Sequence, residues 1–159
     1  MYTVRIKLKA HVAEYLQGKF GTGTPVLVRL PNSSDLFFVL LDLLSKRPES
    51  CPVDRGNCEI LIPDREYGKH PVVYNYISDN AQEVFSAHAE CVMWADIHQY
   101  MEEQKHVKGI NYLQSAYFIV ESLKIKSIST DAIIKNHFRW RKRCRRTWTS
   151  RKKVSMKMG

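Results

Sequence analysis

The chain has 159 residues, 44% of them hydrophobic, and a formal net charge of +9. This length predicts one domain, or a small domain with an appended module, and the apolar content suffices for a buried core. No apolar run reaches the roughly 18 residues that a transmembrane helix needs, and the alternating N-terminus is not the pattern of a signal peptide. We therefore expect a cytoplasmic protein without membrane contact, whose four Cys stay reduced.

Residues 1–75 are predicted to form a small α/β part with a three-stranded sheet. Val4 and Ile6 alternate with charged neighbours, which is the period of a strand with one buried face. The second helix begins after cap residues at 31–34, and Pro48 is expected to end it. The predicted elements are a strand from residue 2, a helix at 11–20, a strand at 26–30, a helix at 36–44 and a strand at 58–62.

Residues 76–147 are predicted to form three helices, and the polar segment 148–159 a disordered basic tail. The first helix, 79–106, is expected to bury a stripe made of Ala81, Val84, Phe85, His88, Val92 and Ala95, with Ile97 and Tyr100 as its possible continuation. The second helix, 110–123, is expected to bury Leu113, Ala116, Tyr117 and Val120. The third helix starts at the cap Ser129 and should pack on the second through Ile134 and Phe138.

The positive charge of the chain is concentrated at its C-terminus. Residues 135–159 contain 11 Lys and Arg and no Asp or Glu, whereas the preceding 134 residues carry 14 basic against 16 acidic residues, a net of −2. Such a density attracts a polyanion, and nucleic acid is the commonest polyanion in a cell. A solvated charged face is the alternative interpretation, and the absence of a compensating acid in this segment argues against it.

Basic residues of this segment follow the period of a helix. They form one continuous stripe that consists of Lys135, Arg139, Lys142 and Arg146. A helix, a short turn and a second, basic helix are the outline of a helix-turn-helix. The usual repressor spacing nevertheless fails, because Val120 stands where its turn needs Gly. The outline therefore predicts an irregular helix-turn-helix or a three-helix variant.

Position along this helix predicts how each residue contacts DNA. Early positions of a recognition helix usually reach base edges, and later basic residues meet the phosphates. The residues expected to read sequence are Lys135, Asn136 and Arg139. The residues expected to contribute affinity are Arg143, Arg145, Arg146, Arg151, Lys152 and Lys153, and Lys142 of the stripe is expected to contact DNA without an assigned role.

The order of a small α/β part, helices and a basic terminal helix resembles uncharacterised helix-turn-helix-like proteins of bacterial prophages and conjugative elements. The resemblance is prompted by segment 127–141, about a tenth of the chain, which begins Ser-Ile-Ser-Thr-Asp-Ala. It implies a DNA-binding or regulatory role in a mobile element. It assigns no role to individual residues.

Other polar clusters favour neither a metal site nor an enzyme. A candidate zinc set consists of Cys51, Cys58, His88 and Cys91. Structural zinc usually needs closer Cys pairs, and the last two residues fall on the predicted apolar side of a helix, so core positions are favoured. His98 and Glu102 share a helix face, and such a spacing more often indicates a surface pair than an acid/base couple. We predict no catalytic residues, no metal and no cofactor.

These observations together predict an α+β protein with a small three-stranded sheet and a C-terminal three-helix, helix-turn-helix-like part. Its expected function is nucleic-acid binding, with DNA preferred over RNA because a helical outline suits the major groove, as a transcriptional regulator or as an accessory protein of a mobile element. A homodimer is compatible with this function, because two such helices can occupy adjacent half-sites. The alternative is a protein-interaction adaptor whose basic C-terminus binds an acidic partner.

Overall fold

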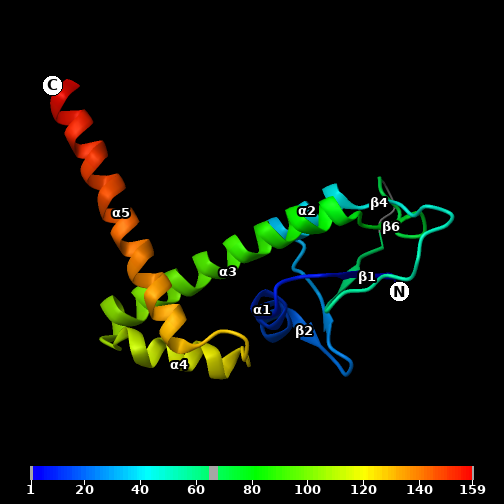
Figure 1. Ribbon diagram of the computed structural model, residues 1–159, viewed down its shortest axis with the longest axis horizontal. Helices are drawn as coiled ribbons and strands as arrows, with labels where there is room; N and C mark the ends of the chain where they lie inside the picture. The colour runs from blue at the N-terminus through cyan, green and yellow to red at the C-terminus, as the bar shows by residue number, and fades with distance from the viewer. Residues whose placement is uncertain (1, 65–67, 159) are drawn as a thin grey trace.

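The computed structural model describes residues 2–64 and 68–158 and shows the mixed α+β architecture that the sequence predicted (Figure 1). Its elements are β1 (Tyr2–Ile6), α1 (Ala10–Phe20), β2 (Gly21–Thr22), β3 (Leu27–Val28), α2 (Asp35–Leu43), β4 (Ser45–Lys46), β5 (Cys58–Ile62), β6 (Tyr74–Tyr76), α3 (Asp79–Lys108), α4 (Tyr112–Ser122) and α5 (Thr130–Met158). The helix α3 runs along the length of the molecule, from the strands to α4, and α5 projects from the α4 end (Figure 1). No helix in these two ranges is both long and apolar enough to cross a bilayer.

The main sheet has four strands in the order β1-β5-β3-β2, one more than predicted. β5 pairs antiparallel with β1, where Val4 lies opposite Ile60, and parallel with β3, where Val28 lies opposite the same residue. β2 pairs antiparallel with β3, and β4 and β6 form a separate antiparallel pair. β2, β4 and β6 were not predicted, because two or three residues are too few to show an alternating pattern.

One hydrophobic core joins the sheet to the helices. Ile6 of β1 and Ile60 of β5 are fully buried, and Leu16 of α1 lies in the same cluster. The cluster continues along α3 and reaches Ile119 of α4 and Ile133 of α5. The N-terminal sheet and the C-terminal helices therefore support one another, and α5 is attached to the end of a continuous core.

The inner face of α3 differs from the predicted stripe. Ser78 caps the helix by accepting a hydrogen bond from the Ala81 N–H at 3.3 Å. The buried ridge follows a spacing of four and consists of Phe85, Ala89, Met93, Ile97 and Met101. Val84, His88 and Ala95, which the prediction placed inside, are exposed. Apolar residues occur on more than one side of this helix, so the choice of face depends on what packs against it.

The apolar face of α4 is also rotated from the predicted one. The side chain of Asn111 caps the helix by accepting from the Gln114 N–H at 2.9 Å. Ala116 and Ile119 are buried, whereas Leu113 and Tyr117 are 50% and 55% exposed. The run Ala-Tyr-Phe-Ile-Val at 116–120 makes the helix apolar on most sides, which is why periodicity alone selected Leu113 and Tyr117 together with the buried Ala116.

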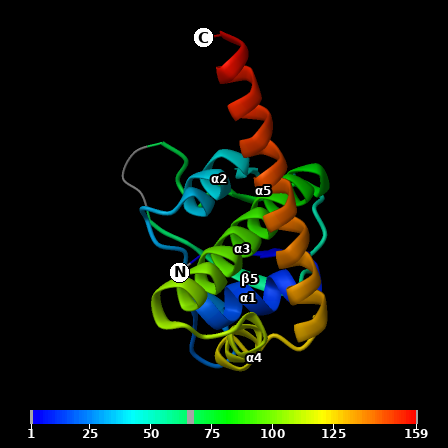
Figure 2. The same ribbon diagram turned by 90° about the vertical axis from the view of Figure 1, so that its left-hand side faces the viewer.

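The helix α5 is packed at its start and free along the rest of its length (Figure 2). Ser129 caps it by accepting from the Ala132 N–H at 3.1 Å, and Ile133 and His137 are fully buried. Every side chain from Lys142 to Lys157 is exposed. The helix continues to Met158, past residue 148, where the sequence predicted a disordered tail. Extending an existing helix needs no new nucleation, so a polar segment can continue it.

The start of α5 allows a direct test of this packing. Phe138, which the sequence predicted to be buried, is 48% exposed and touches the Tyr112 ring edge-on at a centroid distance of 5.9 Å. Phe138→Ala should therefore lower the free energy of unfolding by only about 1 kcal/mol. Ile133→Ala removes a fully buried side chain and should cost about 3 kcal/mol. Chemical denaturation measures both losses, and equal values would contradict this packing.

Candidate nucleic-acid interface

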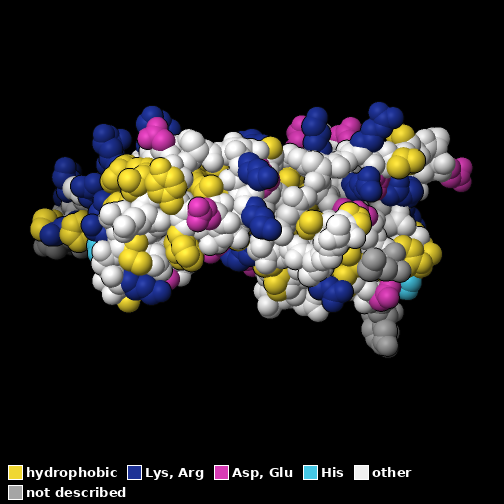
Figure 3. Space-filling model, turned by 90° about the horizontal axis from the view of Figure 1, so that it is seen from below, with side chains coloured by type: hydrophobic (Ala, Val, Ile, Leu, Met, Phe, Trp, Pro, Cys, Tyr) yellow, Lys and Arg dark blue, Asp and Glu magenta, His cyan; other side chains and the backbone are white. Residues whose placement is uncertain are grey.

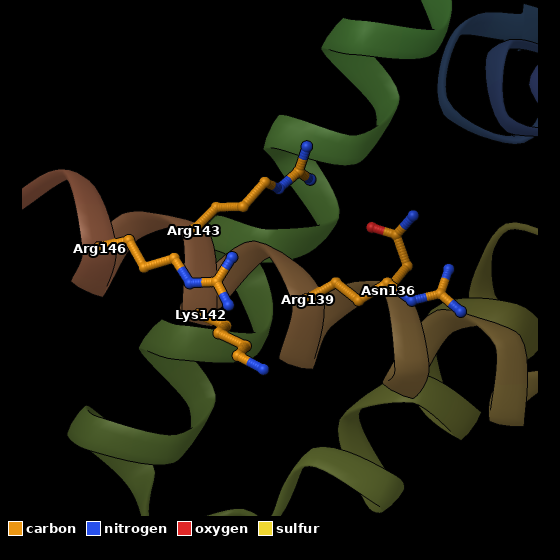
Figure 4. Close-up of a pocket in the computed structure, with 5 residues that line it drawn as sticks. All are labelled: Asn136, Arg139, Lys142, Arg143 and Arg146. Atoms are coloured by element: carbon orange, nitrogen blue, oxygen red, sulfur yellow. The ribbon is translucent and has the colours of Figure 1, made fainter.

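An open groove along α5 is lined by basic side chains. Its lining residues are Asn136, Arg139, Lys142, Arg143 and Arg146 (Figure 4). Asn136, Arg139, Arg143 and Arg146 follow one another at intervals of three or four positions, and Lys142 lies three positions after Arg139, so all five lie on adjoining turns of one side of the helix. The side chain of Arg143 extends toward α3, so the groove borders the junction of the two helices (Figure 4). All five belong to the set that the sequence predicted to contact DNA.

The other predicted contact residues lie outside this groove. Lys135 Nζ is 3.0 Å from Asp131 Oδ2, one helical turn earlier, and both side chains are mostly exposed. Arg145 and residues 151–153 lie on the free part of α5, where all side chains face solvent. The structure thus separates a compact groove near the body from basic residues farther along the helix.

The cations of the groove have no acidic partner in the described parts of the chain. Within residues 2–64 and 68–158, Arg139, Lys142, Arg143 and Arg146 make no ion pair. Arg141, which was not predicted to contact DNA, differs in that its Nε lies 3.2 Å from Glu102 Oε1. Unpaired cations that lie close together produce a positive potential that attracts an anion.

The base of α5 is held by the carboxylate of Glu102. Its Oε1 accepts hydrogen bonds from His137 Nε2 at 2.8 Å and Tyr112 Oη at 3.0 Å, and its Oε2 lies 2.8 Å from His106 Nε2. Burial acts to raise the pKa of Glu102, but the hydrogen bonds and the charge of Arg141 outweigh it and lower the pKa. Glu102 is therefore an anion at neutral pH, and it joins α3, α4 and α5.

Two buried histidines extend this network. The Nδ1 atoms of His98 and His137 are 2.9 Å apart, so one carries the proton and the other accepts. Because Glu102 accepts from Nε2 of His137, the neutral pair has the His98 Nδ1–H donating to His137. Burial, reinforced by the charge of His137, lowers the pKa of His98 to about 4. Burial also lowers the pKa of His137, although Glu102 opposes this.

The prediction of a surface pair formed by His98 and Glu102 is wrong. His98 is 3% exposed, and its contact with Glu102 runs through His137 of another helix. Spacing along α3 could reveal only that the two residues share a face. It contained no signal for His137, which is 39 positions from His98.

Two tryptophans stack on His98 and line a second hollow between α3 and α5. The ring of Trp140 lies 4.7 Å from that of His98 at 8°, and the ring of Trp94 lies 5.8 Å away at 22°. Both indoles are partly exposed. The hollow shares Asn136 and Arg143 with the basic groove, so the two depressions adjoin. Trp94 was not predicted from the sequence to be a functional residue, because its position beside α5 depends on how α3 and α5 cross.

The candidate zinc residues do not come together. Cys58 is buried in β5, and this burial raises the pKa of its thiol to about 12. Cys51 lies in a loop, and His88 and Cys91 are exposed on α3 instead of lying on its apolar side. Among the residues that the structure describes, no three His, Cys, Asp or Glu side chains gather in a metal-binding arrangement.

Comparisons with models of protein families, with curated proteins and with solved structures find no match for this chain. The geometry of the groove and of the helix junction beneath it is therefore the basis for a proposed function.

Proposed function

We propose that the protein binds nucleic acid, and DNA in particular, through the basic groove of α5. The observation that carries this proposal is a set of four adjoining cations, for which the described part of the chain supplies no acidic partner, on a helix that projects into solvent. An α-helix with its side chains is about 10–12 Å wide, and the major groove of B-DNA is about 12 Å wide. A free helix with cations on one side matches that shape and charge.

The position of each residue supports a division of roles. Asn136 and Arg139 lie nearest the body of the protein, and amide and guanidinium groups can pair with adenine and guanine edges. Arg145 and residues 151–153 face solvent farther along α5 and are suited to phosphates. A preferred sequence would indicate a transcriptional regulator. Binding without preference would indicate an accessory protein, such as one of a mobile element.

The connection between α4 and α5 and the length of α5 both differ from a usual helix-turn-helix. The connection between α4 and α5, residues 123–129, is longer than the usual turn of about three or four residues. α5 also continues well beyond its contact with α4. We therefore infer that DNA contacts depend on α5 as a projecting helix more than on the pair of helices.

The salt dependence of binding tests the proposed function. Each phosphate contact contributes about −0.9 to the slope of log K against log salt. The four groove cations alone predict a slope of roughly −3.6, so the affinity for duplex DNA should fall at least about 150-fold between 50 and 200 mM salt, and contacts farther along α5 would steepen the slope. Fluorescence anisotropy with a labelled random duplex measures this slope. A lack of binding at 50 mM salt, or a slope near zero, would rule out the proposal.

A second candidate function, protein interaction, is favoured by the surface of α4. Leu113, Tyr117 and Phe118 are 50%, 55% and 60% exposed, and Figure 3 shows hydrophobic side chains gathered at this end of the molecule. Exposed apolar patches often mark protein contacts. In this alternative the basic helix would bind an acidic partner, and a second copy of the chain is another occupant for the patch. Failure to bind any nucleic acid would favour this alternative.

A further inference from the structure

The hollow that carries the inference lies between α3 and α5, beside the basic groove. Trp94 and Trp140 line it, and Asn136 and Arg143 lie both here and in the groove. A ligand can therefore span the two depressions without leaving the protein surface. One depression offers aromatic rings, and the other offers cations.

Packing of α5 on α3 explains only part of this arrangement. His98 and His137 are buried and hydrogen-bonded, as expected of groups that fasten two helices. The two indoles are less enclosed, because each packs on the junction and keeps part of its surface accessible beside the hollow. An accessible indole beside hydrogen-bond donors is suited to a flat ring with polar edges.

The charges around the hollow also fit such a ring. Glu90 lies at the rim, but its carboxylate is 2.9 Å from Lys9 Nζ and 3.7 Å from His11 Nε2, so its charge is compensated. Arg139, Lys142 and Arg146 line the basic groove and not the hollow, whereas Arg143 lines both. A neutral ring in the hollow and an anionic phosphate in the groove would each meet complementary chemistry.

We propose that this hollow binds an unpaired nucleic-acid base, stacked on Trp94, whose neighbouring phosphates lie on Lys142 and Arg146. The inference rests on the proposed function and names its ligand as a strand with at least one unpaired base. A base within a duplex has both faces covered by its neighbours, whereas an unpaired base offers a free face for aromatic stacking. The Asn136 amide and the Arg143 guanidinium can then contact the edge of the base or its phosphate.

Relative affinity for single-stranded and duplex DNA tests this inference. The probes are a labelled 15-nucleotide oligothymidine and a labelled random duplex of the same length, titrated by anisotropy at one salt concentration. Wild-type protein should prefer the single strand. Because stacking typically contributes about 5- to 150-fold per base, Trp94→Leu should weaken single-strand binding by that factor and change duplex binding by less than about twofold.

Three features make the experiment decisive. The ratio of the two affinities does not depend on the fraction of folded protein, so partial unfolding of Trp94→Leu cannot imitate the expected result. Trp94→Phe keeps an aromatic face and should restore part of the single-strand affinity. Phe38→Leu is the matched control, because Phe38 is an aromatic residue 55% exposed on α2, outside both depressions, and its substitution should change neither affinity.

The outcomes separate this inference from the function on which it rests. Equal wild-type affinity for both probes, or equal weakening of both by Trp94→Leu, overturns the base-binding hollow and leaves DNA binding by the groove intact. A Phe variant no better than the Leu variant also overturns it, because aromatic stacking would then play no part. Failure of the wild type to bind either probe overturns the proposed function itself.

Discussion

Neutralising the basic groove should weaken binding to duplex DNA about 10³-fold at 0.1 M salt. The variant replaces the four groove cations by Gln, at Arg139, Lys142, Arg143 and Arg146. At this salt concentration each lost phosphate contact removes nearly a factor of ten, because its counterions are no longer released. The salt slope should become less negative by roughly 3.6. Anisotropy titrations at several salt concentrations measure both quantities.

The matched control removes the same charge from the other end of the molecule. Its four exposed sites are Lys7, Arg29, Lys46 and Arg55, each changed to Gln. We expect less than a threefold change in affinity, because these residues lie away from α5. If the control weakens binding as much as the groove variant, net charge explains the interaction and the groove has no special role.

Substitution is a better test than deletion of the C-terminal segment. Removing residues 135–159 would also remove His137, which is buried and bound to both His98 and Glu102. A buried partner left without its hydrogen bond destabilises the protein. Loss of binding in a truncated chain would then reflect damage to the junction as well as loss of charge.

Acid should destabilise the protein through His98. Its pKa in the folded state is lowered to about 4 by burial and by His137, against an ordinary value of 6.5. The unfolded chain therefore takes up this proton at a higher pH than the folded one does. The stabilisation is complete above about pH 6.5, is lost as the pH falls, and levels off near pH 4.

The size of this effect follows from the displaced protonation equilibrium. Each pKa unit between the unfolded and the folded value corresponds to about 1.4 kcal/mol. The free energy of unfolding should therefore fall by about 3 kcal/mol between pH 6.5 and pH 4. For a chain of this size the melting temperature should fall by roughly 6–12 °C. His137, Glu102 and Arg143 also act on this site, and protonation of Glu102 adds to the loss at the acid end. Melting curves by circular dichroism from pH 7 to pH 4 measure the total.

Two substitutions test whether His98 causes the loss of stability in acid. His98→Gln keeps an N–H donor for His137 but removes the titrating group, so its melting temperature should depend less on pH between 6.5 and 4. His88→Gln changes an exposed histidine of the same helix and should behave as the wild type. An undiminished acid transition in His98→Gln would show that the pH dependence arises elsewhere.

Local patterns in the sequence were sufficient where the signal lies within one element. The alternation in β1, the apolar run of β5 and the cap residues Ser34 and Ser129 all predicted elements that the structure contains. A strand period or a cap involves residues a few positions apart, so no knowledge of the rest of the fold is needed. β4 could not be predicted in this way, because its two residues form a strand only by pairing with β6, which lies later in the chain.

The choice of buried face required the tertiary structure. Leu113, Tyr117 and Phe138 have the apolar character of core residues, yet each is about half exposed. Ala89 and Met93, absent from the predicted stripe, are buried. A helix with apolar residues on several sides can dock in several rotations, and only the shape of its neighbours selects one.

The sequence by itself determined where the positive charge lies, because charge segregation is a property of composition along the chain. It also determined which side of α5 carries Arg139, Lys142 and Arg146, since helical spacing places them there. Only the tertiary structure decided which cations are unpaired and which residues lie beside them. Trp94 and His98 meet α5 because α3 and α5 cross at Glu102, a contact between residues 35 positions apart. Such contacts form when the core packs, and no local period encodes them.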